Sequence, residues 1–188
     1  YAFRVVFPDE TMVARTFDPA TDSWARVADA PVNVGDACAA SAGGKVYLIG
    51  GSWGGTVGAV QEYDPATDSW AERAPMPTPR RSLSCVGVGG LIYAIGGIDS
   101  SGAVVATVEV YDPRADRWTD AADMPVGRFA FAVAAAGANI YVIGGNLLAA
   151  PGAGGYLDRV DVYDTGATGL AAGATGKLAV TWGAMKRQ

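Results

Sequence analysis

Short apolar runs recur along the chain, and segments rich in Gly, Pro, Asp and Ser separate them. One set of runs, at 37–42, 83–88 and 131–136, consists mainly of small side chains, and a second apolar run closely follows each of them. Runs this short between turn-forming residues predict strands rather than helices. Because no connector is long enough to hold a crossover helix, we expect antiparallel meanders. The pattern therefore predicts an all-β fold.

Two phrases repeat along the chain with a common period. In the first phrase an aromatic residue followed by Asp-Pro leads to a tryptophan, and the tryptophans Trp24, Trp70 and Trp118 are 46 and 48 residues apart. The second phrase, Tyr-x-Ile-Gly-Gly, has the same two spacings and contains the glycine pairs 50–51, 96–97 and 144–145. A period shared by two phrases indicates a structural repeat.

Each repeat is expected to form a sheet of four strands, A to D, of which strand A is the innermost. Strand A carries the small residues, strand B leads into the glycine pair, strand C ends at an aromatic residue and Asp, and strand D carries the tryptophan. The glycine pair leaves room for another backbone, Asp64 and Pro65 open a tight turn, and Tyr63 and Trp70 suit packing between sheets. One such sheet cannot bury both faces, so the sheets are predicted to stack as blades around an axis.

These features resemble the Kelch-repeat family of β-propellers. The period fits the Kelch repeat, at about 50 residues, better than the shorter WD40 repeat. The resemblance covers nearly the whole chain and rests on Gly50, Gly51, Gly96, Gly97, Gly144, Gly145, Tyr63, Tyr111, Tyr163, Trp24, Trp70 and Trp118. It implies an all-β Kelch-type propeller, and such propellers usually close with about six or seven blades.

The repeat is irregular at both ends of the sequence. The first copy starts inside strand B, where Arg4 and Val5 take the place of the glycine pair, so three strands are expected there. In the last copy Thr165 replaces the Pro, a Gly-, Ala- and Thr-rich stretch covers 165–176, and 177–182 is the predicted strand D. We predict a partial blade 1, followed by blades 2, 3 and 4, at 1–32, 33–79, 80–127 and 128–188.

This is less than four full blades, whereas closed propellers have about 4–8. We therefore expect a partial propeller that is a piece of a longer one. The alternatives are an open or four-bladed form and completion by self-association. The start at Tyr1 rather than Met agrees with a fragment, a processed product or the ordered part of a larger protein. An uncovered apolar blade face marks an interface or an aggregation risk.

Composition excludes several kinds of site. The 14 Lys and Arg against 19 Asp and Glu give a net charge of −5, which argues against binding to nucleic-acid phosphates. The sequence has no His, so His-dependent triads and His-ligated metal sites are excluded. Cys38 and Cys85 form no CxxC pair, and we expect two reduced, partly buried thiols. No apolar run is long enough to span a bilayer, and no signal-peptide pattern is visible.

The meander predicts where a binding surface lies. Strands A and B run in opposite directions, so the B–C loops and the D–A linkers share one end of the propeller, and the uniform Asp-Pro turns lie at the other end. Variable loops on a rigid scaffold are the usual place for recognition. The Kelch resemblance implies that these two loop sets line the face that binds peptides or proteins, and the matching candidates are Asp36, Trp53, Arg81, Ser82, Asp99, Phe129 and Asn146.

Several candidates have a structural alternative. Trp53 could fold back onto a neighbouring blade, and Phe129 could pack between blades. Arg80 and Arg128 lie 16 residues before a glycine pair and match a Kelch arginine that is usually structural, so Arg81 is the better contact candidate. A solvated turn residue is the simplest interpretation of Asp36, Asp99 and Asn146.

We expect the chain to be a non-catalytic interaction module for a protein or peptide. The alternatives are a piece of a Kelch-type enzyme, an oxidase or a carbohydrate-acting enzyme, and a glycan-binding surface module. No paired carboxylates or metal-ligand cluster stand out, so no catalytic residue, metal or cofactor is predicted. Nucleic acid is not an expected partner. The compartment stays open, with the cytoplasm slightly favoured.

Overall fold

The computed structural model describes residues 2–6, 11–147, 155–166 and 182–184, and these residues form strands, turns and loops. Within these ranges no helix is long and apolar enough to cross a membrane. The first two sheets contain β1 (Ala2–Val6), β2 (Thr11–Asp18) and β3 (Ser23–Arg26), then β4 (Cys38–Ala42), β5 (Lys45–Ile49), β6 (Val60–Asp64) and β7 (Ser69–Arg73). The next two contain β9 (Ser84–Val88), β10 (Leu91–Ile95), β12 (Val108–Asp112) and β13 (Arg117–Asp120), then β14 (Ala132–Ala136), β15 (Asn139–Ile143), β16 (Val160–Asp164) and β17 (Trp182–Ala184).

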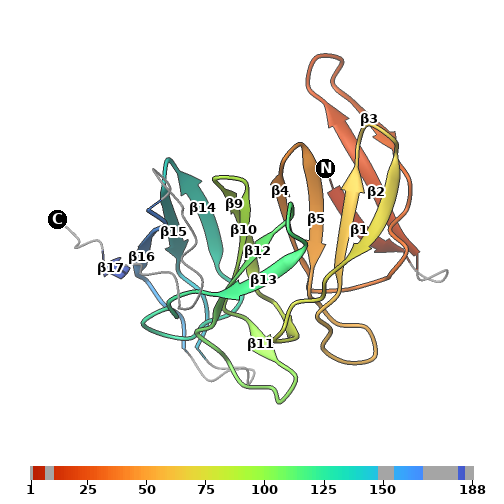
Figure 1. The fold of residues 1–188 in the computed structure, drawn as a ribbon. Coiled ribbons are helices and arrows are strands. Elements are labelled where there is room, and N and C mark those ends of the chain that lie inside the picture. Colours follow the sequence, from red (N-terminus) through yellow and green to blue (C-terminus); the bar gives the residue numbers. More distant parts are fainter. Residues whose placement is uncertain (1, 7–10, 148–154, 167–181, 185–188) are drawn as a thin grey trace.

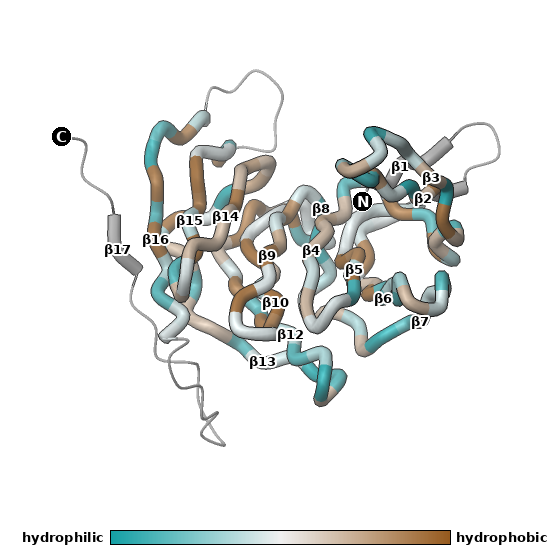
Figure 2. The backbone as a smooth tube through the Cα atoms, turned by 90° about the horizontal axis from the view of Figure 1, so that it is seen from above, coloured by the Kyte–Doolittle hydropathy of each residue, from teal (hydrophilic) through white to brown (hydrophobic). Residues whose placement is uncertain are grey.

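All pairings within the four sheets are antiparallel, and each sheet follows the chain order. The sheets stand side by side from the red N-terminal one to the blue one (Figure 1). Viewed from above, the sheets that begin with β4, β9 and β14 run outward from a common region where these three strands lie (Figure 2). β9 packs against both β4 and β14. The chain is thus a partial β-propeller, as the sequence predicts, and we call its sheets blades 1 to 4.

The glycine pairs are contact points between blades. Gly50 has a φ of 68°, and a Cβ there would lie 2.5 Å from the carbonyl oxygen of Arg80 in the next blade. The N–H of Gly51 donates to that same oxygen over 2.8 Å. Gly96 and Gly97 repeat the arrangement with Arg128, at 2.6 Å and 2.8 Å. In these two pairs the first glycine therefore admits the backbone of the next blade, and the second binds it.

The D–A linkers that lead into blades 2 and 3 are also held by the blade that follows them. The N–H of Ala28 donates to the carboxylate of Asp68 over 2.8 Å, and the indole Nε1 of Trp70 donates to the Ala28 carbonyl over 2.7 Å. One repeat later, the Ala74 N–H donates to Asp116 and its carbonyl accepts from Trp118, both over 2.9 Å. We call such an Asp and Trp the linker latch. It explains why both residue types recur in the repeat.

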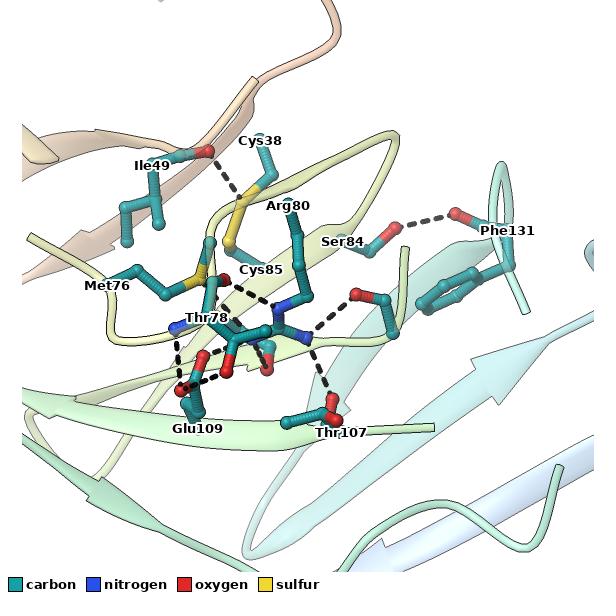
Figure 3. Close-up of a disulfide and its surroundings, with 12 residues drawn as sticks. Cys38, Ile49, Met76, Thr78, Arg80, Ser84, Cys85, Thr107, Glu109 and Phe131 are labelled. Carbon is teal, nitrogen blue, oxygen red and sulfur yellow. Dashed lines mark hydrogen bonds and ion pairs between the residues drawn. A yellow bond between two sulfur atoms is a disulfide. The ribbon is translucent and has the colours of Figure 1, made fainter. Parts of the chain in front are cut away.

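Cys38 and Cys85 form a disulfide between blades 2 and 3, so the prediction of two reduced thiols is wrong (Figure 3). Their Cα atoms are 5.6 Å apart, on the innermost strands β4 and β9. These strands approach closely because Gly87 has no side chain, and a Cβ there would overlap the carbonyl oxygen of Ser41. The cysteines are 47 residues apart, close to one repeat, which brings them to neighbouring positions in successive blades.

A buried ion pair stabilises blade 3. Arg80 is fully buried, and its Nη2 donates to Glu109 over 2.7 Å, while its Nη1 donates to the carbonyl oxygens of Gly96 and Thr107, both over 2.8 Å (Figure 3). Blade 4 has the same arrangement, because buried Arg128 pairs there with Asp161. Both arginines are therefore structural, as their place in the repeat predicts.

Blade 2 has a neutral version of this pair. Val34 and Gln61 occupy the positions of Arg80 and Glu109, one repeat earlier. The Gln61 side chain accepts from the N–H of Val32 over 2.9 Å and donates to the Val32 carbonyl over 3.0 Å. At this position of blade 2, an amide thus satisfies the linker backbone in place of a buried ion pair.

Glu62 is the centre of a second polar cluster in blade 2. Its buried carboxylate accepts hydrogen bonds from Tyr47 at 2.8 Å, from Lys45 at 2.6 Å, and from Arg73 at 3.0 and 2.8 Å. Burial raises the pKa of Glu62, but the hydrogen bonds from Arg73, Lys45 and Tyr47 outweigh it and lower the pKa to about 2. The ionised carboxylate is therefore the form that the fold stabilises.

This cluster predicts an acid-sensitive contribution to stability. The pKa of Glu62 falls from 4.5 to about 2 on folding, so its contribution is complete above about pH 5 and disappears as the pH falls towards 2. We expect about 2 kcal/mol, a discounted value because Lys45 and Arg73 are partly exposed. Urea denaturation of the protein and of Glu62→Gln at several pH values measures it. The two stabilities should converge towards pH 2; a constant difference between pH 6 and pH 2 would contradict the cluster.

Candidate functional site

The B–C loops and the D–A linkers meet at one end of the propeller. In blade 3 this contact forms a short sheet of β8 (Arg80–Arg81) and β11 (Ile98–Asp99), in which Arg81 pairs with Ile98. Single bridges take the same place in the neighbouring blades, Gly35 with Ser52 and Phe129 with Asn146. The structure therefore brings together the two loop sets that the sequence singles out.

The linkers are also joined from blade to blade. The N–H of Ser82 donates to the Asp36 carbonyl over 2.9 Å, and the N–H of Ala130 donates to the Ser82 carbonyl over 3.1 Å. These three residues have φ angles of 54°, 52° and 51°, a left-handed conformation that is uncommon for residues other than glycine. Asp36 and Ser82 thus hold the face in shape through their backbone. We call this loop end, from blade 2 to blade 4, the loop face.

Trp53 projects from the loop face of blade 2. Its side chain is 45% exposed, so it is not packed away against a neighbouring blade. The backbone holds its position, because the Trp53 N–H donates to Gly55 over 2.9 Å and Ser52 bridges to Thr56 on the other side of the turn. An aromatic side chain on a fixed turn is suited to contact a partner.

The side chains of Arg81 and Asp99 differ in how many hydrogen bonds they make within the fold. Arg81 is partly exposed and its backbone pairs in β8, whereas the neighbouring Arg80 is fully buried. Asp99 accepts hydrogen bonds from the Ser101 hydroxyl at 2.6 Å and from the Ser101 and Ala103 N–H groups at 2.9 and 3.0 Å. The bonds from Ser101 lower the pKa of Asp99. Asp99 is therefore chiefly a turn residue.

Blade 4 adds an aromatic residue that is not among the candidates from the sequence. Asn146 bridges to Phe129 on one side and to Tyr156 on the other. Tyr156 is 85% exposed, while Phe129 is partly buried. From the sequence, the loop from Leu147 to Tyr156 is either a contact surface or a tolerated insertion, and the insertion is favoured. Its residues 148–154 lie outside the described part. Tyr156 lies in the B–C loop that begins at Asn146, directly after the glycine pair, and this position is the sequence signal that identifies it as a candidate.

The repeat and the propeller also have counterparts among known proteins. The sequence profile of the Kelch motif matches residues 35–77 and 79–125. This part of the chain therefore consists of Kelch repeats. The solved structure of YjhT superposes on 94% of this Kelch chain with a TM-score of 0.76 and 18% sequence identity, a likeness that shows the fold alone. The Kelch chain spans 58% of the length of that protein. No curated protein matches it by sequence.

Kelch repeats typically mediate protein interactions, and the fold of this chain supports that general role. Away from the loop face, the Kelch chain has an open hollow of about 400 Å³ between β4 and β9, lined by Ala40, Val46, Cys85 and Val86 among others. In the described ranges no group of three or more His, Cys, Asp or Glu residues is placed to hold a metal ion.

Proposed function

We propose that this Kelch chain is a non-catalytic interaction module that binds a protein or peptide on its loop face. The observation that carries the proposal is the continuous hydrogen bonding from Asp36 to Ser82 to Ala130, which fixes three successive linkers relative to one another. A partner can therefore be bound by loops of several blades at once, with little loss of loop entropy on binding.

The side chains on this face support a macromolecular partner. Trp53 and Tyr156 are exposed on B–C loops, and Arg81 lies between them along the chain. Trp, Tyr and Arg are the side chains that most often dominate binding energy at protein interfaces. They lie on loops, whereas the uniform Asp-Pro turns form the opposite end.

Selection from a displayed random-peptide library against the full chain tests the proposal. We expect selected peptides to lose at least about tenfold in affinity with Trp53→Ala or Arg81→Ala, because truncating a hot-spot aromatic or arginine costs about 2 kcal/mol or more and about 1.4 kcal/mol already corresponds to tenfold. The matched control is Arg114→Ala, which removes an exposed arginine from a turn between β12 and β13. Unchanged affinity with both loop-face variants would contradict the site. Glycan-array binding or turnover of a carbohydrate would favour the other two function classes.

A further inference from the structure

Blade 1 contains a complete linker latch. Asp22 and Trp24 stand at the repeat positions of Asp68 and Trp70. The φ angle of Asp22 is 51°, against 48° for Asp68. The ring centroids of Phe17 and Trp24 are 5.1 Å apart with a tilt of 41°, and those of Tyr63 and Trp70 are 5.1 Å apart with a tilt of 43°. The latch is thus already formed in blade 1, with the geometry that holds a linker elsewhere.

The latch of blade 1 holds no linker in the described part of the chain. The linkers at Ala28 and Ala74 bind the latches of blades 2 and 3, and blade 1 stands at the end of the row of sheets (Figure 1). Trp24 is accordingly 54% exposed and Phe17 39% exposed, whereas Tyr63 is fully buried. Trp24 and Phe17 thus form an exposed aromatic surface beside Asp22, whose backbone conformation is already that of Asp68 in an occupied latch.

The two occupied latches define what such a surface binds. In each, one alanine supplies both groups, its N–H to the Asp and its carbonyl oxygen to the Trp. The residue two positions later is buried, as Ala30 and Met76 are, and a proline follows it directly. A linker of this kind starts four residues after the tryptophan of its own strand D.

We propose that the latch of blade 1 docks the D–A linker of a further Kelch-type blade from outside residues 1–188. The linker's alanine donates its N–H to the Asp22 carboxylate and accepts the Nε1–H of Trp24, and the following segment covers Phe17. In blades 2 and 3 a tyrosine hydroxyl donates to the same Asp oxygen as the linker, at 2.8 Å from Tyr63 and 2.6 Å from Tyr111. Phe17 has no hydroxyl, so Asp22 depends more on the linker N–H. The surface is separate from the loop face.

A tethered linker tests this docking in the full chain. The probe is a second copy of residues 69–79, joined ahead of Tyr1 by about 20 Gly and Ser residues, which raises its effective concentration at the latch. The measurement is the indole N–H signal of Trp24 in ¹⁵N NMR, assigned with Trp24→Phe. We expect the signal to move and its hydrogen exchange to slow at least about tenfold.

Two matched controls separate docking from a general effect of the tether. In the first, the alanine of the probe copy that corresponds to Ala74 is replaced by proline, which removes the N–H that Asp22 would accept. In the second, Asp22→Ala removes the acceptor. Both controls should return Trp24 to its signal in the untethered protein. An unmoved Trp24 signal with the intact probe, or an equal shift with the proline probe, would overturn the proposal. A Trp24 shift that depends on the concentration of the untethered protein would assign the surface to a second copy of this chain.

Discussion

Replacing Arg80 with valine is expected to lower the free energy of unfolding by about 3–5 kcal/mol, the range found when one partner of a buried ion pair is removed. Arg80 and Glu109 are both almost completely buried. Without the guanidinium, the Glu109 carboxylate keeps only the N–H and hydroxyl of Thr78, at 3.1 and 3.0 Å. Urea denaturation of the full chain measures the loss. A loss below about 1 kcal/mol would show that the pair is not buried in solution.

Blade 2 provides the control for this prediction. Combining Arg80→Val with Glu109→Gln copies Val34 and Gln61, where an amide bonds the same linker position without charge. We expect the double variant to recover at least half of the lost stability, because it leaves no unpaired carboxylate in the interior. If the single variant fails to fold, the double variant should still fold. A double variant as unstable as the single one would contradict this reading of blade 2.

Reduction of the bond between Cys38 and Cys85 is expected to lower the free energy of unfolding by about 4 kcal/mol. The bond closes a loop of 47 residues, and the chain-entropy relation for disulfides gives about this value for such a length. Urea denaturation with and without a reductant measures the difference. Thiol titration of the denatured, unreduced protein should find no free thiol, and two free thiols would contradict the bond.

The matched variant is Cys38→Ser combined with Cys85→Ser. Its stability should equal that of the reduced protein and should not respond to the reductant. A response of the double variant would assign the effect of the reductant to something other than this disulfide. The comparison also isolates the covalent bond from the packing of the two side chains, which are both buried.

The blades could be predicted from the sequence because their defining residues are local. The predicted strands A at 37–42, 83–88 and 131–136 differ from β4, β9 and β14 only at the first residue. Strand B ends before the glycine pair in blades 2 to 4, and strand C ends at Asp64, Asp112 and Asp164. For strand D of blade 4 the described strand is β17, Trp182–Ala184, which overlaps the prediction at Trp182 only. Residues 177–181 of that prediction lie outside the described part.

Contacts between residues far apart in the sequence are harder to predict, because they depend on how strands and sheets pack together. The sequence marks Arg80 as structural but does not identify Glu109 as its partner, which lies 29 residues away on another strand. The disulfide was missed for a related reason, because spacing alone does not show that β4 and β9 lie side by side. The nearly equal repeat positions of Cys38 and Cys85 were the available signal.

The sequence predicts that the B–C loops and D–A linkers meet at one end, but not what each candidate side chain does there. Arg81 and Phe129 do occupy equivalent positions, and each pairs with the B–C loop of its own blade. Asp99 proved to be bonded within its own turn, and the backbones of Asp36 and Ser82 join neighbouring linkers. The exposure of a side chain such as Trp53 depends on how the turn folds, which the residue types around it do not specify.

The linker latch gives the assembly of the blades a direction during synthesis. The acceptor for Ala28 lies 40 residues further along the chain, and that for Ala74 lies 42 residues further. At a translation rate of about 5–20 residues per second, each linker waits roughly 2–8 seconds for its acceptor to be synthesised. A blade that has just left the ribosome therefore has all of its own strands, but its D–A linker is not yet bound. The next blade supplies the Asp and Trp that bind this linker.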